Sequence, residues 1–159
     1  MVEKSELALD LARPILEERR ADGLARGVCR LLDEMGYATL LEMPLGTGRR
    51  PDVIGIDGRG RTIIVEIKSG LQDCRTDQKW PDYLPWCDEF FFVVGRDFPR
   101  TEIPEGVGLA IADRYGAEII RSAPMQTITA HRRRKLTLRF ARISAGRLKF
   151  IFAEERSPR

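Results

Sequence analysis

The chain has 159 residues, of which 43% are hydrophobic and 32% charged, and its net charge at pH 7 is +3. This length allows one domain with a full core but not two of ordinary size, so residues 1–159 are expected to form a single α/β domain. No apolar run is long enough to cross a bilayer, and charges interrupt the N-terminal stretch too often for a secretory signal, which predicts a cytoplasmic protein.

Helical periodicity dominates the N-terminal part of the chain. Residues 5–18 have apolar side chains at helical spacing, interrupted by Pro14, and residues 1–22 are interpreted as an N-terminal helical extension. Residues 24–35 place a second set of apolar side chains on one helical face, and Gly36 suits the end of that helix.

The period then changes to that of β-structure. Residues 37–45, 51–57 and 62–70 are strand-like and are separated by short segments rich in glycine and arginine. These three segments predict a three-strand antiparallel meander.

The next region combines a helix with further strands. Residues 71–88 lack two-residue alternation and contain Pro81 and Pro85, which predicts a broken or bent helix. The unbroken apolar run EFFFVV at residues 89–94 is typical of a strand covered on both faces. Residues 106–122 predict another strand pair.

The C-terminal segment, residues 130–159, is strongly basic. Residues 130–145 predict a helix, and residues 149–153 predict a last short strand. Residues 131–159 contain ten Lys or Arg and two acidic residues. Such a segment favours a polyanionic partner, and a solvated helix face is an equally good explanation of the charge run by itself.

Acidic side chains interrupt the meander where apolar residues are the usual choice. The positions of the turns set the register, and with that register Asp52 lies opposite Glu66 and beside Glu42. Lys68 lies two residues beyond Glu66 on the same face. Three carboxylates in one row repel each other, and a divalent metal would remove that repulsion. A solvated strand face is the alternative.

This arrangement suits metal-dependent hydrolysis of a phosphodiester. Asp52 and Glu66 are the candidate ligands of Mg²⁺ or Mn²⁺, together with the backbone carbonyl of Ile67. Lys68 would contact the attacking water or the phosphate. Glu42 is a weaker catalytic candidate, because a one-residue slip would turn it away.

The same residues carry a resemblance to a known superfamily. RPDV, VEIK and the hairpin between them resemble the PD-(D/E)xK nucleases. More narrowly, LARGVCRLL, LLEMPLGTGRRPDV, the block VEIKSGLQDCRTDQKWPDYLPWCDEFFFVV and the basic tail resemble the MmcB-type bacterial DNA-repair family. The similarity covers most of the chain from about Leu24 onward.

The resemblance implies a restriction-endonuclease-like core of a helix, a three-strand antiparallel meander, a helix and a strand. It implies a DNA-repair protein that hydrolyses DNA with a divalent metal, and the alternative is a non-catalytic DNA-binding or scaffold module with the same fold. The superfamily's usual first-helix acid would be Glu42 or Glu34. DNA is the expected partner, and other repair proteins and a homodimer stay open.

Basic residues near the predicted site are candidate DNA contacts. Some follow the metal-site strand or precede Asp52, and the others form the run at the start of the C-terminal helix. The candidates are Arg50, Arg75, Lys79, Arg132, Arg133, Arg134 and Lys135.

Three aromatic residues, Trp80, Tyr83 and Trp86, alternate with charged residues after the predicted metal-site strand. Such side chains can stack on unpaired bases, but large aromatics are more often part of the core. Packing is the favoured interpretation for each of them.

Overall fold

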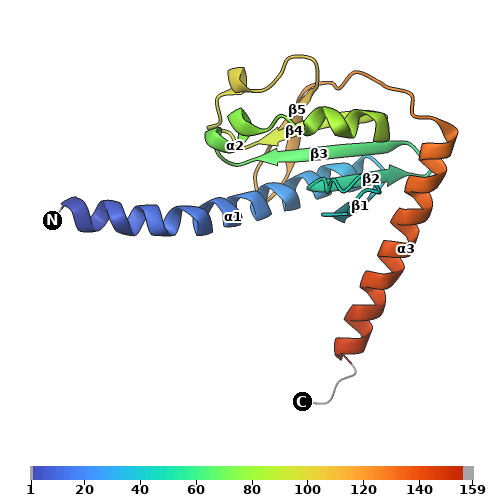
Figure 1. Cartoon of the computed structure of the whole chain (residues 1–159), viewed down its shortest axis with the longest axis horizontal. Coiled ribbons are helices and arrows are strands. Elements are labelled where there is room, and N and C mark those ends of the chain that lie inside the picture. The colour runs from blue at the N-terminus through green and yellow to red at the C-terminus, as the bar shows by residue number, and fades with distance from the viewer. Residues whose placement is uncertain (1, 156–159) are drawn as a thin grey trace.

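A six-stranded mixed sheet forms the centre of the molecule, with helices on both faces (Figure 1). The computed structural model describes the backbone of residues 2–155 and the side chains of residues 18–155. In their order across the sheet, the strands are β1 (Tyr37–Leu41), β2 (Val53–Asp57), β3 (Thr62–Lys68), β4 (Glu89–Val94), β5 (Gly108–Ala112) and β6 (Ala117–Arg121).

The sheet changes from antiparallel to parallel pairing at β3. β1, β2 and β3 are antiparallel neighbours, as the sequence predicted, but they make up only half of the sheet. β4 pairs in parallel with β3, and β5 pairs in parallel with β4. β6 returns antiparallel to β5 and completes the predicted strand pair. Parallel pairing requires crossover connections, and these carry the short helices of the molecule.

Helix α1 (Val2–Glu34) covers one face of the sheet. Leu24, Val28 and Leu32 are buried against the central strands. Close contact of this helix with the β5–β6 turn requires glycine, because a Cβ on Gly27 would lie 1.9 Å from the Asp113 carbonyl oxygen. The predicted interruption at residue 14 is wrong, since the backbone is helical through it and a proline removes only one backbone donor.

The opposite face is covered by three elements, α2 (Leu71–Thr76), the 3-10 helix η1 (Trp80–Trp86) and α3 (Ala130–Glu155). They pack over a core of aromatic and aliphatic side chains that includes Phe90, Phe92 and Leu136. The predicted broken helix at residues 71–88 is therefore two short helices. The second is a 3-10 helix with Pro81 at its start and Pro85 inside it. A further 3-10 turn, η2 (Arg100–Glu102), precedes β5.

α3 is longer than predicted and projects from the body at its C-terminal end (Figure 1). The strand predicted at residues 149–153 is wrong, because the helix that begins at Ala130 continues through that run. A short apolar run by itself does not distinguish a strand from a helix. Neither α3 nor any other helix in the described residues combines the length and apolar character that crossing a bilayer needs.

Candidate active site

The strand register brings the predicted acidic row together. β2 and β3 pair so that Val53 lies opposite Val65, as the turns predicted. At the start of β2, the Glu42 N–H donates to the Asp52 carbonyl at 3.0 Å. Glu42, Asp52 and Glu66 therefore belong to neighbouring strand ends at one edge of the β1–β2–β3 meander.

Asp52 and Glu66 are linked by hydrogen bonds through the backbone. The Ile67 N–H donates to Asp52 Oδ2 at 2.7 Å, and the Asp52 N–H lies 3.4 Å from Glu66 Oε1. Glu66 is buried, with 8% of its surface exposed, and its carboxylate also accepts a hydrogen bond from the Tyr83 hydroxyl. Both acids are therefore held in place before any ligand arrives.

Burial shifts the titration of this pair. It raises the pKa of Asp52, against the opposing effect of the Ile67 N–H and of the Lys68 charge. Burial and the adjacent charge of Asp52 together raise the pKa of Glu66 to about 8. Two neighbouring carboxylates that resist ionisation together will share a proton near neutral pH unless a cation replaces it.

Lys68 is buried beside the two acids but is ion-paired with residues of the next connection. Its Nζ lies 2.6 Å from Asp77 Oδ2 and 3.6 Å from Asp73 Oδ2. Burial alone would lower the pKa of Lys68, but the hydrogen bond to Asp77 and the surrounding negative charges outweigh that effect and raise it. Lys68 is therefore a fixed cation at the edge of the site.

These residues line an open cavity of about 460 Å³ between α1 and the ends of β1, β2 and β3. Of its lining residues within the described part of the chain, six are acidic and Lys68 is the one basic residue. The acidic lining residues are Glu18, Asp22, Glu42, Asp52, Glu66 and Asp73.

Sequence reasoning missed the contribution of α1 to this cavity. Glu18 and Asp22 are exposed on this helix and line the cavity. Their spacing of four residues puts both on one side of a helix, which is the signal that could have identified them. The interpretation of residues 1–22 as an N-terminal helical extension assigns them no part in the site. Glu34, the other acid considered, lies exposed at the end of α1 and is not among the residues that line the cavity.

The donor set fits a loosely held hard cation rather than a closed metal site. Among the described residues, no three His, Cys, Asp or Glu side chains gather closely enough to hold a metal ion. The exposed Glu42 carboxylate lies 3.4 Å from Arg50. The half-buried Asp52 and the buried Glu66 remain as an adjacent pair, because the ammonium of the neighbouring Lys68 is ion-paired with Asp77 and Asp73. Mg²⁺ needs only one or two carboxylates and keeps several waters, so this pair suits it.

The predicted DNA contacts near the strand ends differ in whether their side chains already have an ion-pair partner. Arg50 pairs with Glu42, and Arg75 makes a two-pronged ion pair with Glu102, with nitrogen–oxygen distances of 3.0 and 2.8 Å. Lys79 is exposed. Arg75 therefore has a structural partner, which weakens its case as a phosphate contact.

In the basic run on α3, two side chains contact other residues of the protein and two are exposed. Arg133 binds both Asp88 carboxylate oxygens at 2.8 Å and the Gly60 carbonyl at 2.6 Å, so it anchors the helix. Arg132 lies over the Trp86 ring, 5.5 Å from its centroid. The two remaining members of the run, Arg134 and Lys135, are exposed.

The aromatic residues also divide. Trp80 and Tyr83 stack on Phe90 with ring centroids 5.7 and 6.0 Å apart, so the packing interpretation is right for both. Trp86 is half-buried at the end of η1, where it faces a groove beside α3.

Comparison with known proteins gives the chain a family. The family model described as DNA repair protein MmcB-like matches residues 13–155. The chain belongs to the MmcB-like family. The matched residues include the lining of the cavity, the whole sheet, all of α3 and the larger part of α1. No curated protein gave a match.

A solved structure shares the MmcB-like fold of this chain. It is a protein of unknown function from Silicibacter pomeroyi, with 39% sequence identity and a TM-score of 0.81. The alignment covers 87% of this chain and 95% of the other. The similarity therefore extends over nearly the whole of both molecules.

Proposed function

We propose that the protein is a divalent-metal-dependent nuclease of the PD-(D/E)xK type that hydrolyses DNA phosphodiester bonds in repair. One observation carries this proposal. Asp52 and Glu66 are forced together at the ends of β2 and β3, where their negative charges have no full compensation, and Lys68 lies beside them. Burial of such a pair is costly in a protein that has no cation to bind there.

The order of elements supports the same assignment. α1, the meander β1–β2–β3, the helical connection and β4 follow one another as in the restriction-endonuclease-like core that the resemblance implies. The family description, DNA repair protein MmcB-like, supports DNA as the substrate.

In this proposal Asp52 and Glu66 hold the ion, with the Ile67 backbone carbonyl as a further ligand. Continued by two residues beyond the Val53–Val65 pair, the register would set Pro51 opposite Ile67. Proline has no N–H, so Pro51 cannot donate to that carbonyl, which is then available to a cation. When bound, Mg²⁺ or Mn²⁺ would polarise the phosphate and acidify a water molecule.

Lys68 would orient the phosphate or the attacking water. Its ammonium is fixed by Asp77, whose pKa is held low because the hydrogen bonds from Lys68 and from the backbone outweigh the effect of burial. Tyr83 positions Glu66 through its hydroxyl. The chain thus supplies two anionic ligands and one cation in fixed positions, which is what stabilisation of a phosphoryl transition state requires.

A second candidate function is that of a DNA-binding or scaffold module without catalysis. The ion pairs of Lys68 favour it, because two carboxylates already occupy that ammonium. In this case the acidic cavity would bind a structural cation or none, and the basic surface of α3 would account for DNA binding.

Cleavage and binding by Asp52→Asn separate the two candidates. Single-stranded, duplex, flap and branched DNAs are incubated with Mg²⁺ or Mn²⁺, and binding is measured in parallel without metal. The nuclease proposal expects cleavage by the native protein, loss of cleavage in Asp52→Asn, and unchanged or tighter DNA binding, because a negative charge has been removed.

The chain provides a matched control in its second Pro-Asp pair. Asp82 is exposed, pairs with Arg49 and is not a lining residue of the cavity, so Asp82→Asn removes an equal charge. Asp82→Asn should cut like the native protein. Clean native protein that binds DNA but cuts none of the substrates would favour the scaffold function.

A further inference from the structure

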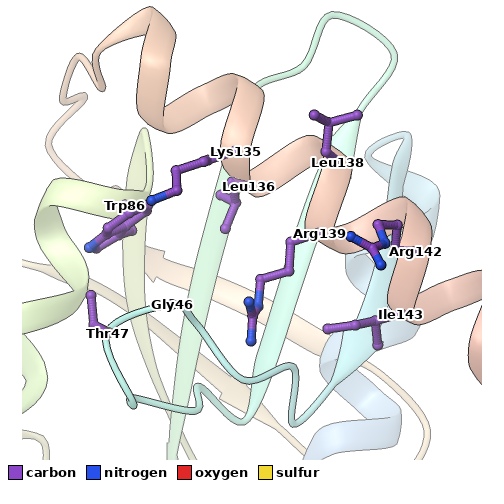
Figure 2. Close-up of a pocket in the computed structure, with 9 residues that line it drawn as sticks. All are labelled: Gly46, Thr47, Trp86, Lys135, Leu136, Leu138, Arg139, Arg142 and Ile143. Atoms are coloured by element: carbon purple, nitrogen blue, oxygen red, sulfur yellow. The ribbon is translucent and has the colours of Figure 1, made fainter.

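A second, basic groove lies between α3 and the segment that joins β1 to β2 (Figure 2). Its volume is about 650 Å³. α3 contributes Lys135, Arg139 and Arg142, and Trp86 of η1 lies across from them, whereas none of the lining residues that the structure describes is acidic. Figure 2 shows Lys135 and Arg139 extending from the helix into the space above the loop. The groove is thus the electrostatic opposite of the acidic cavity.

α3 is held in place along the groove by three arginines. Arg133 binds Asp88 and Gly60 at the start of the helix. Arg139 and, farther along, Arg147 donate to backbone carbonyls of the β1–β2 segment. The walls of the groove are therefore fixed relative to each other before any ligand binds, which lowers the ordering cost of binding.

Two of the groove's cations have no partner within the described part of the chain. Lys135 and Arg142 are exposed, and neither forms an ion pair or a side-chain hydrogen bond with a described residue. Arg139 uses its Nε for the Pro44 carbonyl and still presents a charged guanidinium. Three positive charges along one helix face, spaced by four and three residues, suit a ligand with repeated negative charges.

We propose that this groove binds single-stranded DNA, with phosphates at Lys135 and Arg142 and an unpaired base that takes the place of the Arg132 guanidinium over the Trp86 ring. The inference rests on the proposed function for its ligand, because the charges alone would accept any polyanionic strand. A half-buried indole among cations is the arrangement by which proteins hold unpaired bases without selecting a sequence. A base within a duplex cannot reach such a surface.

α3 connects the groove with the acidic cavity. Arg147 donates to the Leu41 carbonyl at 2.6 Å and lies 3.2 Å from the Glu42 carbonyl. α3 therefore passes from Trp86 to the residue next to the candidate active site. A strand in the groove would be led toward the cavity, where carboxylates repel its phosphates until a cation is bound.

Binding of a labelled oligothymidylate of about 16 nucleotides, without divalent metal, tests the groove directly. The double variant Lys135→Glu and Arg142→Glu should weaken binding by at least about tenfold. The slope of log affinity against log salt should fall by about 1.4, since each lost phosphate contact on a single strand removes about 0.7. Both positions are exposed, so the fold should be unchanged in circular dichroism.

The control variant changes the same charge elsewhere. Arg26→Glu with Arg59→Glu alters exposed positions on α1 and in the β2–β3 turn, outside the groove. It should bind within about threefold of the native affinity, because screening weakens the effect of distant surface charges. Equal losses in the two double variants would overturn the proposal, since binding would then depend on net charge and not on the groove.

Tryptophan fluorescence tests the stacking contact. The chain has two tryptophans, and the other, Trp80, is partly buried against Phe90 and does not line the groove. The oligonucleotide should quench the native protein, whereas Trp86→Phe should show no quenching. Quenching that persists in Trp86→Phe would show that no base stacks on Trp86. Tighter binding of duplex than of single strand would overturn the single-strand assignment.

The outcomes distinguish failure of the groove proposal from failure of the nuclease proposal. Loss of binding in the groove variant, in a protein that cuts nothing, supports the groove and contradicts the nuclease. Cleavage of single strands by the groove variant with an unchanged KM supports the nuclease and overturns the groove.

Discussion

The segment between β1 and β2 has an acidic cavity at its two ends and a basic groove beside its middle. The cavity contains six carboxylates and one buried lysine, and its key acids are held by hydrogen bonds to backbone and tyrosine. The groove contains three exposed cations and an indole. One short segment thus separates the two signs of charge.

The two regions differ in the solution conditions that should control ligand binding. In the cavity the central charges, Glu66 and Lys68, are buried, so their interactions are strong and depend on protonation. In the groove the charges are solvated, so their interactions are weak singly, additive along a strand and sensitive to salt. A reaction at the cavity should therefore respond to pH and metal, and strand binding should respond to ionic strength. The predictions below test that division.

The largest effect is expected from Glu66→Gln, which removes one of the two candidate metal ligands. Metal-dependent cleavage should fall by about 10²–10³-fold, the usual cost of losing one group that stabilises a charged transition state. Strand binding without metal should stay within about twofold. Initial rates on the best DNA substrate, with binding by anisotropy, measure both.

Glu89→Gln is the matched control for that change. Glu89 lies on the neighbouring strand β4, and burial also raises its pKa, but it is not one of the residues lining the cavity. Its substitution should leave cleavage within about threefold. Equal losses in the two variants would mean that Glu66 supports the sheet and not the reaction.

The meander could be predicted from sequence because local signals define it. Turn positions fix the register between β2 and β3, and with it the approach of Asp52 to Glu66. The first part of α3, residues 130–145, was likewise predictable from its period and charge, whereas its continuation through residues 149–153 was not. A run of alternating apolar residues between marked turns leaves few other arrangements.

What the sequence could not provide depends on contacts between distant segments. The spacing of Glu18 and Asp22 puts both on one side of α1, but nothing local to the helix specifies that this side faces the strand ends. The ion pair of Arg133 with Asp88 joins residues 45 positions apart. A charge run therefore does not reveal which arginines anchor the helix and which remain free.

The pH dependence of metal binding should span about 100-fold. The pKa of Glu66, about 8, lies above its ordinary value, so a proton competes with the metal at neutral pH. Apparent Mn²⁺ affinity should rise about tenfold per pH unit from pH 6 to 8 and then level off. Titration calorimetry at several pH values measures this, and Glu66→Gln should lose the slope.

The raised pKa of Glu66 also makes the folding stability of the metal-free protein depend on pH. A carboxyl group whose pKa is raised by folding binds its proton more tightly in the folded state, so this contribution favours folding at low pH. It should decline as pH rises from about 4.5 to about 8, and added Mn²⁺ should restore stability most at the upper end. Metal affinity that does not vary between pH 6 and 8 would contradict the assignment of Glu66 as a ligand.

The next largest effect is expected at Asp88, whose ion pair with Arg133 anchors α3. Asp88→Ala removes an acceptor of Arg133 and of the Thr62 N–H, and should cost about 2 kcal/mol in urea unfolding. Strand binding should weaken with it, because the groove wall is released. Asp82→Ala breaks an exposed pair with Arg49 and should cost less than about 1 kcal/mol.

The sign of the Asp88 contribution is opposite to that of Glu66. The hydrogen bonds from Arg133 and Thr62 outweigh burial and hold the pKa of Asp88 below its ordinary value. Its stabilisation is therefore complete above the unfolded pKa, about 3.9, and is lost as pH falls through the folded value. A stability difference between the native protein and Asp88→Ala that grows on acidification would contradict this account.

The smallest effect is expected at Glu42, the third acid of the row. Its side chain is exposed and pairs with Arg50, and its backbone has a φ of 48°, a conformation that favours glycine. Glu42→Gly should therefore keep or slightly raise the melting temperature and change cleavage by less than about threefold. Since glycine retains the backbone N–H that bonds Asp52, a large loss of cleavage could only come from the missing carboxylate, and would show that Glu42 turns into the cavity when the metal binds.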